Sequence, residues 1–326
     1  MSASVAVPQP IPVAGFRDVY DVSQVDRVLQ DLPGTANESL RAVYEKMLRF
    51  GGQRFTVKPS SMPAMDELIE DLPNFSEVLS DIRKQLALCI DSSDAIELPP
   101  MLLLGAPGIG KTHFARRISQ LLGTGFGFVP MSSLTAGWIL SGASSQWKNS
   151  KPGKVFETFL HGEYANPVMV VDEIDKASSD GQYDPLGALY GLLEAETATR
   201  FVDEFVEIPI DASGAVWFAT ANDHACIPEP ILNRLNVYEI DRPDAEGAAR
   251  IALAIYREIR GAHDWGRAFP EQPDAPVLEK LAALLPREAR RAIQSAFGSA
   301  KLAGRSELRP EDVQERATGR KQRIGF

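Results

Sequence analysis

The chain has 326 residues, of which 44% are hydrophobic and 24% charged, as is typical of globular proteins that bury a sizeable core. Its formal net charge of −10 disfavours a protein that coats duplex nucleic acid. The apolar runs are far shorter than a transmembrane helix needs, and residues 1–15 do not resemble an export signal. We therefore expect a cytoplasmic protein without membrane contact, in which Cys89 and Cys226 pack as small core residues and bind no metal.

Residues 1–63 are predicted to form an N-terminal extension. Residues 1–15 are rich in Pro, Ala and Val and are predicted to be disordered, and two amphipathic helices follow. The second helix is predicted to begin at a capping box of Thr35 and Glu38. The apolar stripe of the pair can pack on the main body or dock a partner, and both alternatives stay open. In the first helix the stripe comprises Val22, Val25, Val28, Leu29 and Leu32.

Residues 64–242 are predicted to form an α/β domain. Short apolar runs alternate there with helical stretches, and their length is typical of strands buried on both faces of a sheet. The pattern predicts a parallel sheet with helices on each side and with strands at residues 101–104, 127–131, 168–172, 215–220 and 237–241.

After Pro243 the predicted strands stop. Residues 243–318 are expected to form a small all-helical domain, with helices at 244–260, 276–285, 287–303 and 310–317. Residues 319–326 are predicted to be a basic tail, for which a solvated terminus is favoured over contact with nucleic acid or an acidic partner. The basic residues near this end are Arg316, Arg320, Lys321 and Arg323.

A glycine-rich loop follows the first predicted strand of the sheet. Its sequence, GAPGIGKT, fits the phosphate-binding pattern G-x-x-x-x-G-K-[ST]. Glycines let the backbone N–H groups converge on phosphate oxygens, Lys111 can reach the β- and γ-phosphates, and the Thr112 hydroxyl can bind Mg²⁺. A surface loop with an idle lysine is the disfavoured alternative. The predicted nucleotide-binding residues are Gly105, Ala106, Pro107, Gly108, Ile109, Gly110, Lys111, Thr112 and His113.

Two further strands are predicted to end in polar residues. The strand at 168–172 ends in Asp172 and continues into Glu173, at the carboxyl edge where open α/β sheets bind ligands. We expect Asp172 to hold Mg²⁺ and Glu173 to polarise the attacking water, whereas the alternative is that these acids cap the next helix. Asn222, just after the strand at 215–220, can orient that water through its amide, although alone it is an ordinary turn residue.

Two arginines have a position in the chain that suits contact with a phosphate group. Arg234 precedes the last predicted strand, and Arg287 begins a helix of the small domain. An arginine that meets the γ-phosphate can accelerate hydrolysis by about 10³–10⁵-fold. Taken in isolation, each arginine would more often form a surface salt bridge.

The chain resembles the AAA+ ATPases and, within them, the ATPase module of Lon proteases. The resemblance covers residues 99–305 and is carried by GAPGIGKT, NPVMVVDEIDKASSDGQYDPLGALYGLLE, FATANDHACIPEPILNRLNVYEI and the helix start at Arg287. It implies that Asn222 is the sensor-1 residue and that Arg234 is an arginine finger for ATP in the neighbouring subunit. It also implies that Arg287 is sensor 2, with Arg290 and Arg291 as rivals for that role.

The resemblance also implies a fold and an assembly. The fold is a P-loop NTPase domain with a five-stranded parallel sheet, followed by a four-helix lid, and the assembly is a hexameric ring. Leu72, Pro73 and Phe75 fall where the family has a helix that flanks adenine.

The stretch SSQWKNSKPGKVFE resembles the first pore loop of the family, in which an aromatic–aliphatic pair grips an extended polypeptide. Trp147 matches the aromatic residue, while Lys148 replaces the aliphatic one and Asn149 the glycine. The lysine favours an acidic or specific substrate over general threading. The alternative is that Trp147 packs on its own domain.

We therefore expect an ATPase that uses ATP and Mg²⁺ and remodels a protein partner as a ring of its own subunits. No residues follow the lid that could form a serine–lysine peptidase domain, so we do not expect the chain to cut peptides. A DNA-associated ATPase of the loader or transposition-helper type is the alternative, and an ATP-gated assembly switch is another.

Overall fold

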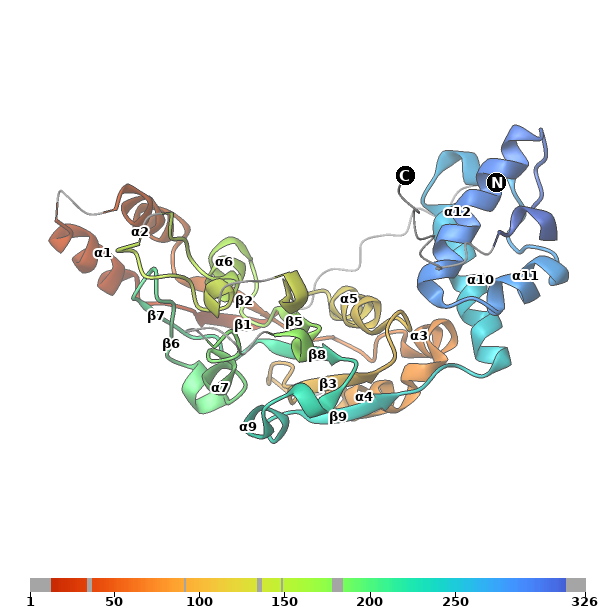
Figure 1. The fold of residues 1–326 in the computed structure, drawn as a ribbon. Coiled ribbons are helices and arrows are strands. Elements are labelled where there is room, and N and C mark those ends of the chain that lie inside the picture. Colours follow the sequence, from red (N-terminus) through yellow and green to blue (C-terminus); the bar gives the residue numbers. More distant parts are fainter. Residues whose placement is uncertain are drawn as a thin grey trace. The chain divides into compact units, whose positions relative to one another are not determined.

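A computed structural model describes residues 13–33, 37–90, 92–133, 137–147, 149–177 and 184–314. The chain divides into two compact units (Figure 1). The sheet unit comprises Met1–Met65, Glu77–Gly105 and Lys111–Ile240. The helical unit comprises Asp66–Ser76, Ala106–Gly110 and Asp241–Phe326.

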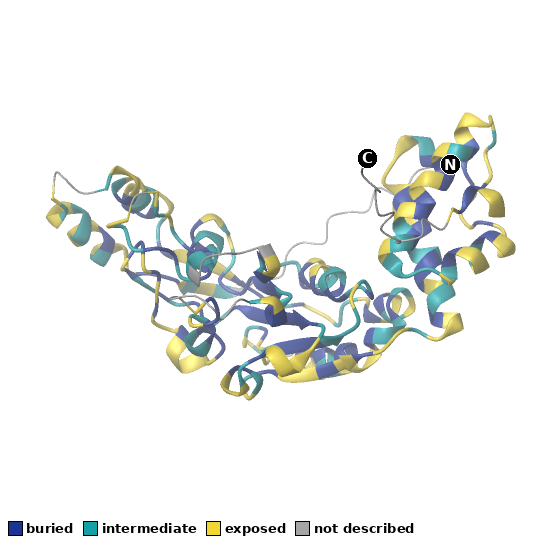
Figure 2. Cartoon of the chain, in the orientation of Figure 1, coloured by how far each residue is buried: buried dark blue, intermediate teal, exposed yellow. Residues whose placement is uncertain are grey.

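The sheet unit is built on a five-stranded parallel sheet with the strand order β4-β5-β8-β3-β9. Every residue of β8 and most residues of β5 are buried, as expected for strands covered on both faces (Figure 2). The five strands lie within one residue of their predicted bounds, and the predicted α/β fold is confirmed. The strands are β3 (Met101–Gly105), β4 (Phe126–Pro130), β5 (Val168–Asp172), β8 (Val216–Ala221) and β9 (Asn236–Ile240).

The strand order brings three carboxyl ends together. From β3 the chain runs out to β4, returns through β5 and β8, and then passes β3 to form β9 at the other edge. Helix α5 (Lys111–Leu122) packs on β5 and β8, and the rings of Phe114 and Phe218 meet edge to face at 6.1 Å. Because β3 is where the order reverses, its carboxyl end is the expected position of a ligand site.

The N-terminal extension is part of the sheet unit. Helices α1 (Val22–Asp31) and α2 (Glu38–Phe50) lie between strands β1 (Val13–Asp18) and β2 (Gln53–Val57), which pair antiparallel. The apolar side chains of both helices share one core with the sheet. Of the two alternatives left open by the sequence, packing on the main body is the one observed. The buried members are Val25, Leu40, Tyr44 and Met47.

A buried arginine fixes this extension to α6 (Lys154–His161). Arg54, only 5% exposed, donates to the carbonyl oxygens of Phe159 and Leu160 at 2.9 and 3.0 Å. It also donates to the carbonyl of Gly51 at 2.9 Å, so one guanidinium satisfies the last carbonyls of two helices. These contacts explain why β2 is held in the sheet unit.

Two predictions for the extension need correction. The strand β1 was not predicted, and it starts at Val13 within the stretch expected to be disordered; residues 1–12 lie outside the described residues. Helix α2 is capped by Asn37, whose side chain accepts from the N–H of Ser39 at 2.9 Å. Thr35, the predicted cap, lies outside the described residues. Asn37 is closer to the helix start and reaches the free N–H directly.

The helical unit contains α10 (Ala245–Gly261), α11 (Ala275–Ala282) and α12 (Pro286–Leu302), close to three predicted helices. Its core includes Tyr256 and Phe297, whose rings stack at 5.1 Å. The fourth predicted helix is only a 3₁₀ turn, Pro310–Asp312, in the described residues, because Arg305 binds both oxygens of Asp312 at 2.7 Å and fixes a loop there. The basic residues Arg316, Arg320, Lys321 and Arg323 lie outside the described residues.

One cysteine differs from expectation. Cys89 is buried, but Cys226 is exposed in a short 3₁₀ turn after β8, where no apolar layer covers it. In the described part of the chain, no helix is both long and apolar enough to cross a membrane. The remaining elements are α3 (Met65–Asp71), α4 (Ser76–Ile90), α7 (Leu189–Leu192), α8 (Ala195–Ala198), α9 (Glu229–Leu232), β6 (Phe201–Val202) and β7 (Pro209–Ile210).

Candidate functional site

The predicted polar residues of the sheet unit meet at the carboxyl ends of β3, β5 and β8. Lys111, the first residue of α5, is only 7% exposed. Its Nζ donates to the carbonyl oxygen of Gly105 at 2.7 Å and to Oδ1 of Asn222 at 3.0 Å. These two hydrogen bonds place the Lys111 ammonium group at the edge of the sheet, where it suits an anionic ligand.

Asp172, at the end of β5, accepts two hydroxyl hydrogen bonds on one carboxylate oxygen. Thr112 donates to Oδ1 at 2.5 Å, and Thr220 donates to the same atom at 2.8 Å. Hydroxyl and carboxylate oxygens are the ligands that Mg²⁺ prefers, so the pair of Thr112 and Asp172 fits a magnesium ion bound together with phosphate.

Glu173 has an uncommon backbone conformation. Its φ of 55° and ψ of 51° lie in the left-handed region, at the start of the 3₁₀ turn Ile174–Lys176. Its N–H donates to Oγ1 of Thr220 at 2.9 Å, which helps hold it there. Non-glycine residues adopt this conformation mainly where the surroundings impose it, often at functional sites. The turn sends the chain away from the strand immediately after Asp172.

Thr220 is a residue of the site that the sequence reasoning missed. It is 1% exposed on β8 and links the two acids, because its hydroxyl donates to Asp172 and accepts from the Glu173 backbone. The signal that could have found it is a hydroxyl residue two positions before Asn222 in a strand buried on both faces.

The tip of the glycine-rich loop belongs to the helical unit. Gly108 and Gly110 have φ values of 84° and 105°, which side chains rarely adopt. A Cβ on Gly108 would lie 3.8 Å from Leu285, just before α12, and one on Gly110 would lie 3.9 Å from Phe75. Leu72 and Phe75 are themselves buried. Within this unit the loop therefore lies beside the start of α12 and the segment expected to flank adenine.

The arginines near the start of α12 differ in their partners. Arg290 forms an ion pair of 2.5 Å with Glu258 of α10. Arg287, the second residue of the helix, is exposed and pairs with nothing in the described part of the chain. Arg291 is exposed as well. Arg287 is therefore the arginine of α12 nearest to Leu285, and no described side chain forms an ion pair with it.

Arg234 lies just before β9 and contacts Tyr190, Glu194 and Pro230. None of these belongs to the cluster around Asp172. Nε lies 2.7 Å from Oε1 of Glu194, and Nη1 donates to the carbonyl oxygen of Pro230. The guanidinium carbon is 5.9 Å from the ring centre of Tyr190.

Comparison with known proteins identifies the region that contains Arg234 and the cluster around Asp172. Residues 101–241 match the ATPase family associated with various cellular activities (AAA). They form an AAA ATPase domain. Such domains bind ATP, typically with Mg²⁺, and AAA proteins typically oligomerise.

The relatives of this AAA domain include Lon proteases. A Lon protease of Halothermothrix orenii is 34% identical over 155 residues, covering 48% of this chain and 20% of that protein. The peroxisomal Lon protease homolog 2 of Spinacia oleracea is 36% identical over 155 residues, covering 48% of this chain and 18% of that protein. The matched part of the chain thus spans about a fifth of the length of these relatives.

A similar solved structure is a mutant of RuvB from Thermotoga maritima, with a TM-score of 0.50 and 17% identity. The aligned region covers 78% of this chain and 70% of the RuvB chain. At this identity the likeness concerns the fold alone.

The loop expected to contact substrate lies within the AAA domain. Trp147 is 42% exposed and packs edge to face on Trp138, with ring centres 5.2 Å apart. Asn149, where the family has glycine, has a φ of 64°, and asparagine tolerates that conformation better than most residues. Lys148 lies outside the described residues. The indole of Trp147 is thus partly packed on its own domain and partly available to a ligand.

A buried carboxylate holds the base of this loop. Asp203 is fully buried and accepts the N–H groups of Gly153 at 2.7 Å and Phe205 at 2.9 Å. A Cβ on Gly142, at the other stem of the loop, would lie 2.5 Å from Oδ1 of Asp203. Burial raises the pKa of Asp203 from 3.8 to about 6, although backbone hydrogen bonds, including that of Gly153, lower it.

This pKa predicts a pH dependence of stability. Between pH 4 and 6 the folded protein binds more protons at Asp203 than the unfolded chain, so the free energy of unfolding falls as pH rises. The wild type should lose about 2 kcal/mol relative to the Asp203→Asn variant across this range. Chemical denaturation of both proteins at several pH values tests this. A stability difference that stays constant with pH would contradict the shift.

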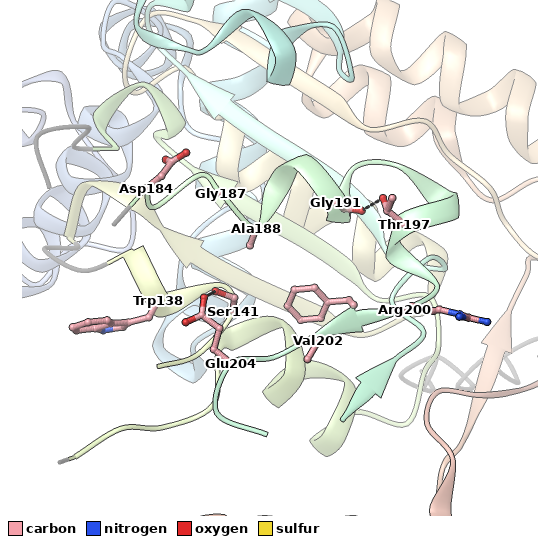
Figure 3. A pocket seen from close by; sticks show the side chains of 11 residues that line it. Trp138, Ser141, Asp184, Gly187, Ala188, Gly191, Thr197, Arg200, Val202 and Glu204 are labelled. Carbon is pink, nitrogen blue, oxygen red and sulfur yellow. Dashed lines mark hydrogen bonds between the residues drawn. The ribbon is translucent and has the colours of Figure 1, made fainter. Parts of the chain in front are cut away.

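A groove of about 540 Å³ runs beside the loop (Figure 3). Trp138 and Ser141 line one side, and Glu204 accepts from the Ser141 hydroxyl at 3.3 Å. Asp184 and Ala188 line another side, while the guanidinium of Arg200 points away. Tyr190 packs beside Arg234, and Tyr183 lies outside the described residues.

Proposed function

We propose that this chain hydrolyses ATP as an AAA+ motor related to the ATPase module of Lon proteases. It uses that energy to remodel a protein partner within a ring of its own subunits, six by analogy with the family. The observation that carries the proposal is the cluster at the sheet edge, where Lys111, Asp172 and Asn222 converge with Thr112 from different parts of the sequence.

Each residue of this cluster has a proposed role. Lys111 and the loop N–H groups bind the phosphates of ATP, while Thr112 and Asp172 would hold Mg²⁺. When bound, that ion would neutralise charge on the phosphates. Glu173 accepts a proton from the attacking water, and Asn222 orients that water through its amide.

The arginines complete the proposed site. Arg234 acts on the ATP of the neighbouring subunit, which is consistent with its contacts lying away from Asp172 in its own chain. Arg287 acts as sensor 2 on the nucleotide of its own chain. We favour it over Arg290, because the latter is engaged by Glu258.

Thr220 provides a test of the way the acids are held. Replacing it with valine keeps the shape but removes the hydroxyl that supports Asp172 and the Glu173 backbone. We expect kcat for ATP hydrolysis to fall about tenfold, because the Glu173 N–H loses its acceptor. Thr220→Ser keeps the hydroxyl and should retain most of the activity. Equal kcat values for Thr220→Val and wild type would argue against this role.

An exposed aromatic beside a groove favours a polypeptide substrate. Trp147 offers a flat apolar surface on a loop whose base is fixed by Asp203, and the net charge of −10 disfavours a nucleic-acid backbone.

The substrate class can be tested through stimulation of ATPase activity. We expect an unfolded protein to raise kcat several-fold, and single- or double-stranded DNA to have no effect over a salt series. Trp147→Ala should lose the stimulation but keep the basal rate. Stimulation by DNA that weakens steeply with salt would favour the DNA-associated alternative instead.

A further inference from the structure

Arg234 is held on three sides by its own chain. Its side chain is 26% exposed, and its Nε lies 2.7 Å from Oε1 of Glu194 as an ion pair and not as an aligned hydrogen bond. Nη1 donates to the carbonyl oxygen of Pro230, one turn earlier. The ring of Tyr190 lies 5.9 Å from the guanidinium carbon, within the range of a cation–π contact.

These contacts leave one end of the guanidinium available. Nε lies beside the Glu194 carboxylate and Nη1 donates to Pro230, whereas Nη2 makes no hydrogen bond within the described part of the chain. A planar guanidinium that is hydrogen-bonded at Nη1 and held beside a carboxylate at Nε has a restricted orientation. An arginine side chain without such contacts would sample many rotamers, and it would lose that conformational entropy on binding a phosphate.

The two side chains that hold Arg234 come from one short segment. Tyr190 in α7 and Glu194 before α8 are four residues apart. The hydroxyl of Thr197 donates to the carbonyl of Gly191 at 2.6 Å and to that of Glu194 at 3.2 Å, which fixes the turn between the helices. Figure 3 shows the first of these bonds.

We infer that Glu194 and Tyr190 are positioning residues for Arg234, and that they orient its free Nη2 toward the ATP of the neighbouring subunit. This inference rests on the proposed role of Arg234. The opposite role for Glu194 is sequestration, in which the ion pair keeps Arg234 away from that ATP. The two roles differ in sign, because loss of Glu194 slows hydrolysis in the first and accelerates it in the second.

The experiment compares Glu194→Gln with Glu196→Gln in the full chain. Both variants remove one exposed carboxylate from the same segment, but only Glu194 touches Arg234. We expect Glu194→Gln to lower kcat about tenfold, since small misplacement of a reacting group is costly, and to leave KM for ATP unchanged. Glu196→Gln should match the wild type. A kcat for Glu194→Gln equal to or above that of the wild type would overturn the inference.

Mixing subunits separates positioning from damage to the fold. Glu173→Gln subunits keep an intact Arg234, so adding them to Glu194→Gln subunits should restore hydrolysis at the Glu194→Gln sites that they adjoin. A fold defect in Glu194→Gln would not be rescued in this way, and absence of rescue would overturn the inference.

Tyr190 gives a second, independent arm. Tyr190→Phe keeps the ring and should retain kcat, while Tyr190→Leu should lower it several-fold. The Arg234→Ala variant distinguishes a failure of the proposed role of Arg234 from a failure of the positioning inference. If Arg234→Ala hydrolyses ATP normally, the proposed function of Arg234 is wrong; if it is inactive while Glu194→Gln and Tyr190→Leu are normal, only this inference is wrong.

Discussion

Replacing Arg234 with alanine is expected to lower kcat for ATP hydrolysis by about 10³–10⁵-fold, the effect of removing an arginine from the transition state of phosphoryl transfer. The variant should still bind ATP, because Arg234 does not touch the cluster of Lys111 and Asp172 in its own chain. Steady-state hydrolysis and equilibrium binding of a fluorescent ATP analogue measure the two effects separately.

If Arg234 acts on the ATP of a neighbouring subunit, the Arg234→Ala variant should be rescued by mixing with another variant. When it is mixed with Glu173→Gln, each variant lacks one component of the site, and the active sites formed at mixed interfaces have an intact Glu173 and an intact Arg234. Hydrolysis should therefore reappear in the mixture although both variants are inactive alone. If mixing restores nothing while co-assembly is shown by pull-down, Arg234 does not act on a neighbouring subunit.

Glu173→Gln is expected to lower kcat by about 10²–10⁴-fold while ATP binding is retained. Glutamine has about the same size, and its backbone N–H can still donate a hydrogen bond to Thr220, but its amide cannot take a proton from water. The matched control is Glu239→Gln, which changes an exposed glutamate on β9, the edge strand that β3 separates from β8 and β5. Undiminished turnover in Glu173→Gln would remove this residue from its proposed role.

The same variant is also the most useful reagent for finding the substrate. A subunit that binds ATP without hydrolysing it remains in the state that holds its partner, so a pull-down with Glu173→Gln should retain more of that partner than one with Lys111→Ala, which lacks the ammonium proposed to bind the phosphates. Equal recovery from both variants would mean that the capture does not depend on the nucleotide state.

The central sheet could be predicted from the sequence because its strands are buried on both faces. Runs such as VMVVD at 168–172 contain only apolar residues before the final acid, so their ends are visible in the sequence. The polar residues that follow Val171 and Ala221 could then be placed at one edge. The family resemblance supplied the proposed roles of Arg234 and Arg287, which composition and spacing alone did not reveal.

Other features depend on contacts that the local sequence does not contain. Strand β2 is held by backbone hydrogen bonds to Glu163 and Ala165, more than a hundred residues away, and its pairing has no local signal. The role proposed for Thr220 depends on its distance to Asp172, which only the fold defines. Cys226 was expected in the core on residue type alone, but its turn lies at the surface.

The measurement that tests the account most directly is the ATPase rate per subunit as a function of protein concentration. If the site at the edge of the sheet needs an arginine from a neighbouring chain, the rate per subunit should rise as subunits assemble and should be absent in Lys111→Ala. A protein that stays monomeric and hydrolyses no ATP at millimolar nucleotide, or one whose rate per subunit is the same in monomers and assemblies, would contradict it.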